Sequence, residues 1–127
     1  MRRICLKGLC KKEKNDSSHF ARATSDEIRE MLEVYGDFIK LAVDVERNVL
    51  AGGGKLHADC EAVLLENGSN NDNVWGADWY PFSQKVEYEA MLNIRPRLGN
   101  RSMFLQDPEL RAMIATIVDN LSRGIQP

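Results

Sequence analysis

Residues 44–94 read DVERNVLAGGGKLHADCEAVLLENGSNNDNVWGADWYPFSQKVEYEAMLNI, and this stretch decides the predicted fold. Apolar and polar residues alternate in several short runs within it, most regularly over residues 85–94. Successive side chains of a β-strand point to opposite faces of the sheet, so this alternation predicts strands with one apolar and one polar face. The triple glycine at residues 52–54 and the polar run at residues 67–73 separate these runs. The stretch therefore predicts an antiparallel sheet.

The alternation begins before this stretch, in residues 39–46, so the first strand lies upstream of it. Arg47 and Asn48 form a two-residue turn after that strand, since asparagine tolerates a positive φ angle. Pro81 ends the strand that begins at Val74, because proline has no N–H to donate to a neighbouring strand. About five strands are expected, at residues 39–46, 49–51, 56–66, 74–80 and 85–94.

Residues 56–66 are ambiguous between a strand and a helix. Apolar residues alternate with His57, Asp59 and Glu61, which favours a strand. The spacing of Ala58, Ala62 and Leu65 also fits one face of a short helix that ends at Gly68. We interpret the segment as a strand and keep the helix as the alternative.

Two amphipathic helices flank the predicted sheet in the sequence. Thr24 and Glu27 have the spacing of a capping box, and the apolar stripe that starts at Ile28 ends before Gly36. This pattern predicts a helix over residues 25–35.

The second helix is predicted over residues 108–123. Asp107 is its N-cap, and Pro108 fits the first turn. An apolar stripe with helical spacing then runs from Leu110 to Leu121, and Gly124 ends the helix. The sequence therefore predicts an α+β fold, namely an antiparallel β-meander of about five strands covered on one face by two helices.

Length and charge restrict the class of protein. A chain of 127 residues fits one domain, which we expect at residues 23–127, after a basic and flexible arm at residues 1–22. The formal net charge is −2, but residues 15–94 carry 15 acidic and 6 basic side chains. The middle of the chain therefore repels nucleic acid, and any contact with it is expected from the basic arm.

The apolar runs are short and the cysteines are few. No run approaches the length of a membrane span, and no secretory signal is visible at the start, so we expect a cytoplasmic protein without membrane contact. The three cysteines are too sparse for a disulfide framework, and reduced thiols are expected.

A first candidate site lies in the ambiguous segment. If it is a strand, His57, Asp59 and Glu61 share one face of the sheet, where Asp44 or Asp78 of a neighbouring strand could join them. Imidazole and carboxylate groups suit a divalent metal such as Zn²⁺ or Mn²⁺, and they also suit an acid–base pair. The alternative is a solvated sheet face whose charges have no further role.

A second candidate site consists of three arginines. Arg95, Arg97 and Arg101 precede the predicted helix at residues 108–123, whose N-terminus favours anions. Guanidinium groups bind phosphate or carboxylate well, so the cluster predicts an anion-binding site. The alternative is that these arginines pair with acidic residues of the sheet.

Three ordered motifs resemble a small bacterial family of proteins of unknown function. They are HADxEAVLLExGS from His57, VWGAD from Val74, and NIRPR followed by NRSM and QDP from Asn93. The likeness covers roughly residues 25–123 and implies a small cytoplasmic bacterial protein. It assigns no catalytic residue.

Two functions are compatible with these patterns. The first is a non-enzymatic binding or interaction module that uses the sheet face or edge and forms homo-oligomers. The alternative is a metal-assisted hydrolase acting on a phosphate-containing substrate, in which the first candidate site holds the metal and the arginines hold the anion.

Overall fold

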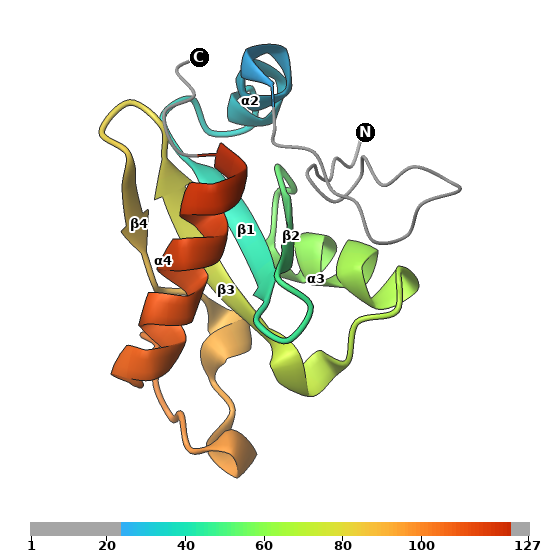
Figure 1. The fold of residues 1–127 in the computed structure, drawn as a ribbon, viewed down its shortest axis with the longest axis vertical. Coiled ribbons are helices and arrows are strands. Elements are labelled where there is room, and N and C mark those ends of the chain that lie inside the picture. The colour runs from blue at the N-terminus through green and yellow to red at the C-terminus, as the bar shows by residue number, and fades with distance from the viewer. Residues whose placement is uncertain (1–23, 123–127) are drawn as a thin grey trace.

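A four-stranded antiparallel sheet forms the centre of the computed structural model, which describes residues 24–122 (Figure 1). The strand order is β2-β1-β3-β4. The strands are β1 (Ile39–Asp44), β2 (Val49–Gly52), β3 (Val74–Tyr80) and β4 (Lys85–Glu87). The predicted α+β class with an antiparallel sheet is confirmed, with four strands rather than five. The basic arm predicted at residues 1–22 lies outside the described residues.

The two predicted helices pack against one apolar cluster of the sheet. They are α2 (Ser25–Leu32), which lies at one end of the sheet, and α4 (Pro108–Ser122), which crosses one face (Figure 1). Thr24 begins α2 with the predicted capping box, because its hydroxyl oxygen accepts from the Glu27 N–H and its own N–H donates to the Glu27 carboxylate. The cluster includes Ile28, Met31, Leu32, Leu41, Val43, Trp75, Ala77, Trp79, Ile114, Ile117 and Val118.

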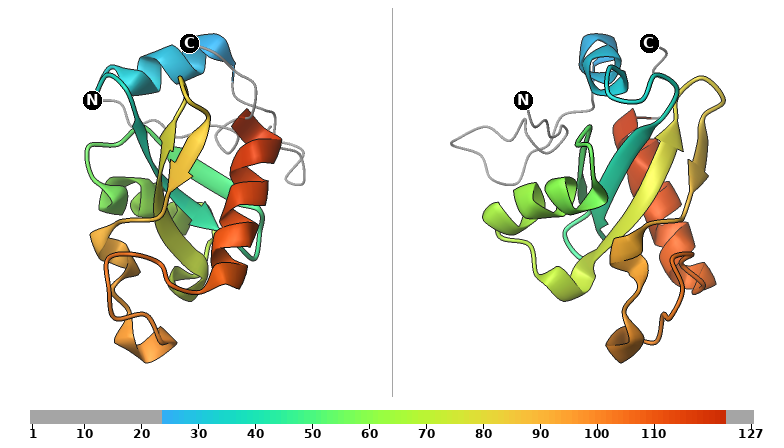
Figure 2. Two further views of the ribbon diagram at one scale, coloured as in Figure 1. Left: turned by 90° about the vertical axis from the view of Figure 1, so that its left-hand side faces the viewer. Right: turned by 180° about the vertical axis from the view of Figure 1, so that it is seen from behind.

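The predicted strand at residues 56–66 is wrong, because the segment forms the helix α3 (His57–Glu66) on the opposite face of the sheet (Figure 2). The Asp59 carboxylate caps its N-terminus by accepting from the Leu56 N–H at 3.0 Å. Gly68, with φ of +100°, adopts the left-handed conformation that follows many helices. Cys60 and Leu64 are buried in a second cluster with Ala42, Val49, Ala51 and Val74.

The predicted strand at residues 85–94 is correct only at its start, since β4 ends at Glu87. Beyond it, Glu89 makes an isolated antiparallel bridge with Phe104, and the chain then forms the 3-10 turn η2 (Met91–Asn93). A Cβ atom on Gly76 of β3 would lie 2.5 Å from the Ala90 Cβ atom. The chain therefore leaves the sheet plane and crosses closely over β3, on the face that carries α3.

Candidate functional site

The inward side of α3 carries polar as well as apolar residues. His57, Cys60, Glu61 and Leu64 have the spacing i, i+3, i+4 and i+7, so they lie on one side of the helix. Cys60 and Leu64 are buried against the sheet. The side chains of His57 and Glu61 are only 10% and 16% exposed. Because burial of a polar side chain is costly without a hydrogen bond or an ion pair, each of these two residues is expected to have such a partner outside α3.

His57 pairs with Asp78 of β3. Its Nε2 atom lies 2.8 Å from Asp78 Oδ1 and 3.2 Å from the carbonyl oxygen of Ala77. Both partners are acceptors, so Nε2 carries the proton and donates it. Nδ1 has no hydrogen bond within residues 24–122 and is not among the fully buried unpartnered atoms, so it reaches solvent. The pair is an oriented imidazole with a free acceptor nitrogen, which is the geometry of a general base.

Glu61 pairs with Arg95, one of the three predicted anion-binding residues. The Arg95 Nη2 atom lies 3.0 Å from Glu61 Oε2, and the same guanidinium donates to the carbonyl oxygens of Leu92 and Asn71. It also lies over the ring of Trp75, 5.3 Å from the ring centroid. This guanidinium therefore holds three parts of the chain together. It contacts α3 at Glu61, the segment before β3 at the Asn71 carbonyl oxygen, and η2 at the Leu92 carbonyl oxygen.

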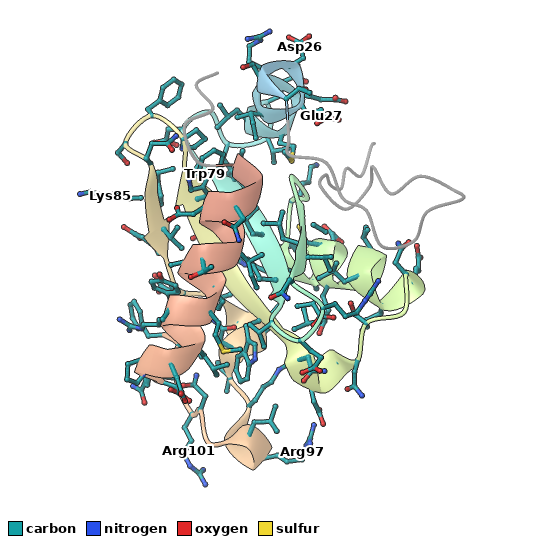
Figure 3. All side chains as sticks on the ribbon, in the orientation of Figure 1. Asp26, Glu27, Trp79, Lys85, Arg97 and Arg101 are labelled. Atoms are coloured by element: carbon teal, nitrogen blue, oxygen red, sulfur yellow. The ribbon has the colours of Figure 1, made fainter. Side chains whose placement is uncertain are left out.

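The other two predicted anion-binding residues lie apart from this contact. Arg97, in the 3-10 turn η3 (Pro96–Leu98), donates to Asp72 at 2.6 Å. The hydrogen bond from Arg97 holds the pKa of Asp72 below its ordinary value. Arg101 is exposed, and no partner is found for it within residues 24–122. Figure 3 shows Arg97 and Arg101 at the same end of the molecule, pointing in different directions.

Of the predicted metal ligands, His57 and Asp78 meet, but Asp44, Asp59 and Glu61 do not join them. Asp44 is fully buried at the end of β1, where its Oδ1 atom accepts from the N–H groups of Glu46 and Arg47. Asp59 caps α3 and faces solvent, so the expected row of His57, Asp59 and Glu61 does not form. Within residues 24–122, no group of three or more His, Cys, Asp and Glu side chains is arranged to hold a metal ion.

Two buried asparagines that the sequence analysis did not single out organise residues 93–106. The Asn93 side chain accepts from the N–H of Gly76 at 2.8 Å and donates to its carbonyl oxygen at 3.0 Å. The Asn100 amide donates to the carbonyl oxygens of Asn93, Ser102 and Phe104, and its oxygen accepts from the Gln106 N–H. Asn93 and Asn100 both belong to the NIRPR…NRSM motif, which was the one sequence feature that pointed to them. Their spacing did not indicate that they are buried.

Part of the α3 face of the sheet stays uncovered, along the neighbouring strands β1, β3 and β4 (Figure 2). In the strand register, Asp78 lies between Lys40 of β1 and Glu87 of β4. Phe38 stacks on Tyr80 with ring centroids 5.3 Å apart, and Tyr35 stacks on the other side of Phe38 at 4.9 Å. We call this surface the open sheet face. Its members are Tyr35, Phe38, Lys40, Asp78, Tyr80 and Glu87.

The electrostatics of the open sheet face are acidic around Tyr80. Partial burial raises the pKa of the Tyr80 hydroxyl, and four neighbouring carboxylates raise it further. These carboxylates belong to Glu87, Asp78, Asp37 and Glu89. Lys85, the first residue of β4, is opposite Tyr80 in the strand register, but its side chain points away from the sheet (Figure 3). The surface therefore combines stacked aromatic rings with negative charge.

The pKa of Cys60 predicts a stability change at alkaline pH. Burial raises the pKa of this thiol from 9.0 to about 12, so the native protein keeps its proton where the unfolded chain loses it. Stability is then lost as the pH rises through 9. Between pH 8 and pH 10 we expect wild type to lose about 1.4 kcal/mol more than Cys60→Ala in urea unfolding under reducing conditions. Equal losses in the two proteins would show that the native thiol ionises normally.

These observations define a small α+β domain in which the helix α3 is joined to the antiparallel sheet by the His57–Asp78 hydrogen bond and to the loop after η2 by the Glu61–Arg95 ion pair. The chain belongs to a family of proteins of unknown function, DUF5674, whose sequence model matches residues 20–121. No curated protein matches the sequence, and no solved structure matches it. None of the helices within residues 24–122 has both the length and the apolar character needed to cross a membrane.

Proposed function

We propose that this protein is a binding module that recognises a basic segment of a partner protein on its open sheet face. The observation that carries the proposal is the position of Tyr80, which stacks on Phe38 and is surrounded by carboxylates. Aromatic rings attract cations through their electron-rich faces, and carboxylates add a direct charge interaction. A lysine or arginine side chain of a partner satisfies both.

A contact within the protein supports this chemistry. The Nζ atom of Lys40 lies over the ring of Tyr35, 5.1 Å from its centroid. One end of the aromatic stack therefore already accepts an ammonium group, whereas Tyr80 at the other end lies beside Glu87 and carries no such cation of its own among the described contacts. A lysine or arginine side chain of a partner can bind over the Tyr80 ring at that end of the stack.

The metal-assisted hydrolase has less support than the binding module. Of its metal ligands, Asp59 caps a helix, Asp44 lies in a buried turn and Glu61 pairs with Arg95, so only the contact between His57 and Asp78 joins two of them among the described residues. Two of its three arginines are held by Glu61 and Asp72. The pairing of His57 with Asp78 is the one feature that fits acid–base chemistry.

The proposal predicts that a labelled peptide rich in lysine and arginine binds the protein, with an affinity that falls as salt is added. Glu87→Lys reverses a charge beside Tyr80 on an exposed strand, so we expect it to weaken binding roughly tenfold or more in a fluorescence polarisation titration. Light scattering of the protein alone separates self-association from binding of a different partner.

The matched control is Glu109→Lys, which makes the same charge change at an exposed position of the first turn of α4. It should leave peptide affinity nearly unchanged. If both variants weaken binding equally, only net charge matters and the open sheet face is not the site. Failure of the wild-type protein to bind the peptide would also refute the proposal.

A further inference from the structure

A partly open hollow of about 260 Å³ lies on the α4 side of the protein, separate from the open sheet face. Its apolar lining comes from three parts of the chain: Trp75 of β3, Leu105 of the loop and Leu110 of the first turn of α4. Trp75 and Leu105 are 4% and 0% exposed, so they belong to the core that the hollow reaches. Leu98 and Gln106 also line it.

Trp75, which lines this hollow, carries a hydrogen-bond donor that is unused within residues 24–122. Its indole N–H makes no hydrogen bond within residues 24–122. The nitrogen is not a fully buried atom either, because Asp44 Oδ2 is the one fully buried unpartnered side-chain atom in those residues. Only 4% of the Trp75 residue is exposed, so the N–H lies within that small exposed part, and Trp75 is one of the residues that line the hollow. A buried indole N–H normally has a partner.

The polar side chains that line the hollow differ in how many hydrogen bonds they already make within the protein. The Asn100 amide is fully occupied by backbone groups of its own loop. Asp107 uses Oδ1 to cap α4, accepting from the Glu109 N–H at 2.8 Å. The Gln106 side chain is exposed and has no partner within the described residues. A ligand in the hollow therefore meets the indole donor, the free amide of Gln106 and the negative charge of Asp107.

We infer that the hollow binds a small, uncharged, planar heterocycle of the lactam type, in which a ring carbonyl lies next to a ring N–H. The carbonyl accepts from the Trp75 N–H, the ring packs against the partly exposed side chains of Leu98 and Leu110, and the outer edge pairs with the Gln106 amide. The volume is slightly below the usual range for ligand sites, which fits one ring or two fused rings. Asp107 disfavours anions, and a purely apolar ligand leaves the indole donor unpaired.

The test uses 2-pyridone and uracil as probes in ¹H–¹⁵N NMR titrations of the full chain. The protein has two tryptophans, so its spectrum has two indole N–H signals, and the signal lost in Trp75→Phe identifies the relevant one. We expect this signal to move downfield and to saturate, with a dissociation constant on the order of 1 mM, as befits a ligand of so few atoms.

Gln106→Ala removes the exposed amide without disturbing the core and should weaken probe binding roughly fivefold. Leu98→Phe narrows the hollow and should abolish binding, whereas Met113→Phe, at an exposed site on α4 outside the hollow, should not. The inference is overturned if neither probe shifts the Trp75 signal. It is also overturned if benzene, which has no carbonyl, shifts that signal as strongly as 2-pyridone.

Discussion

Replacing Asn93 with leucine is expected to lower the free energy of unfolding by about 3–5 kcal/mol, although the two side chains are similar in size. Asn93 is fully buried, and its amide satisfies both the N–H and the carbonyl oxygen of Gly76. Leucine leaves these two buried backbone groups unpaired, and each such group costs about 1–3 kcal/mol. Urea unfolding measured by tryptophan fluorescence gives the difference.

Two further variants test this interpretation of Asn93. Asn93→Asp keeps the oxygen that accepts from Gly76 but loses the donor, so its destabilisation should be substantial while the fold is retained. Met91→Leu changes an exposed residue of the same 3-10 turn and should alter stability by less than about 0.5 kcal/mol. A cost below about 1 kcal/mol for Asn93→Leu would mean that Gly76 finds other partners.

The Asn93 amide completes the sheet where a strand is missing. The ladder between β3 and β4 ends at the pair of Asp78 and Glu87, so the edge of β3 at Gly76 has no neighbouring strand. The side-chain amide of Asn93 supplies the same donor and acceptor that a strand would supply. Gly76 suits this site because the crossing chain leaves no room for a Cβ atom beside Ala90. The VWGAD and NIRPR motifs are therefore two halves of one contact.

The sequence predicted those elements whose buried side is apolar throughout. The α4 stripe and the alternation in β1 and β3 are of this kind, and these elements formed where expected. The α3 segment was misread because its inward side includes His57 and Glu61, which hides the helical period of its apolar residues. Its alternation of polar and apolar residues over residues 56–66 then resembled a strand.

The candidate site was predicted in part. Sequence analysis selected His57, Asp78, Glu61 and Arg95, and the structure places all four in partly buried contacts. It grouped the acidic residues with one another and the arginines with one another, whereas the fold pairs acid with base across 21 to 34 residues of sequence. The packing of α3 on the sheet decides which acidic residue meets which basic residue. The order of charges along the chain does not predict this packing.

Arg95→Met is the second change for which we expect a large effect, a loss of about 2–4 kcal/mol in the free energy of unfolding. The variant removes the ion-pair partner of Glu61, which is only 16% exposed and keeps a hydrogen bond from the Asn71 side-chain amide. It also leaves the carbonyl oxygens of Leu92 and Asn71 without this donor. A carboxylate that loses its partner in a partly buried place is costly. The Arg97–Asp72 pair is far more exposed, at 67% and 46%, so Arg97→Met should cost much less.

A double-mutant cycle separates a structural role of Arg95 from anion binding. If Arg95 holds α3 to the loop through Glu61, Glu61→Gln combined with Arg95→Met should be less destabilising than the sum of the single variants by at least about 1 kcal/mol. If Arg95 instead binds an anion, inorganic phosphate should raise the melting temperature of wild type and of Glu61→Gln but not of Arg95→Met. Since Arg95 already has Glu61, two carbonyl oxygens and the Trp75 ring as partners, we expect the coupling and no effect of phosphate.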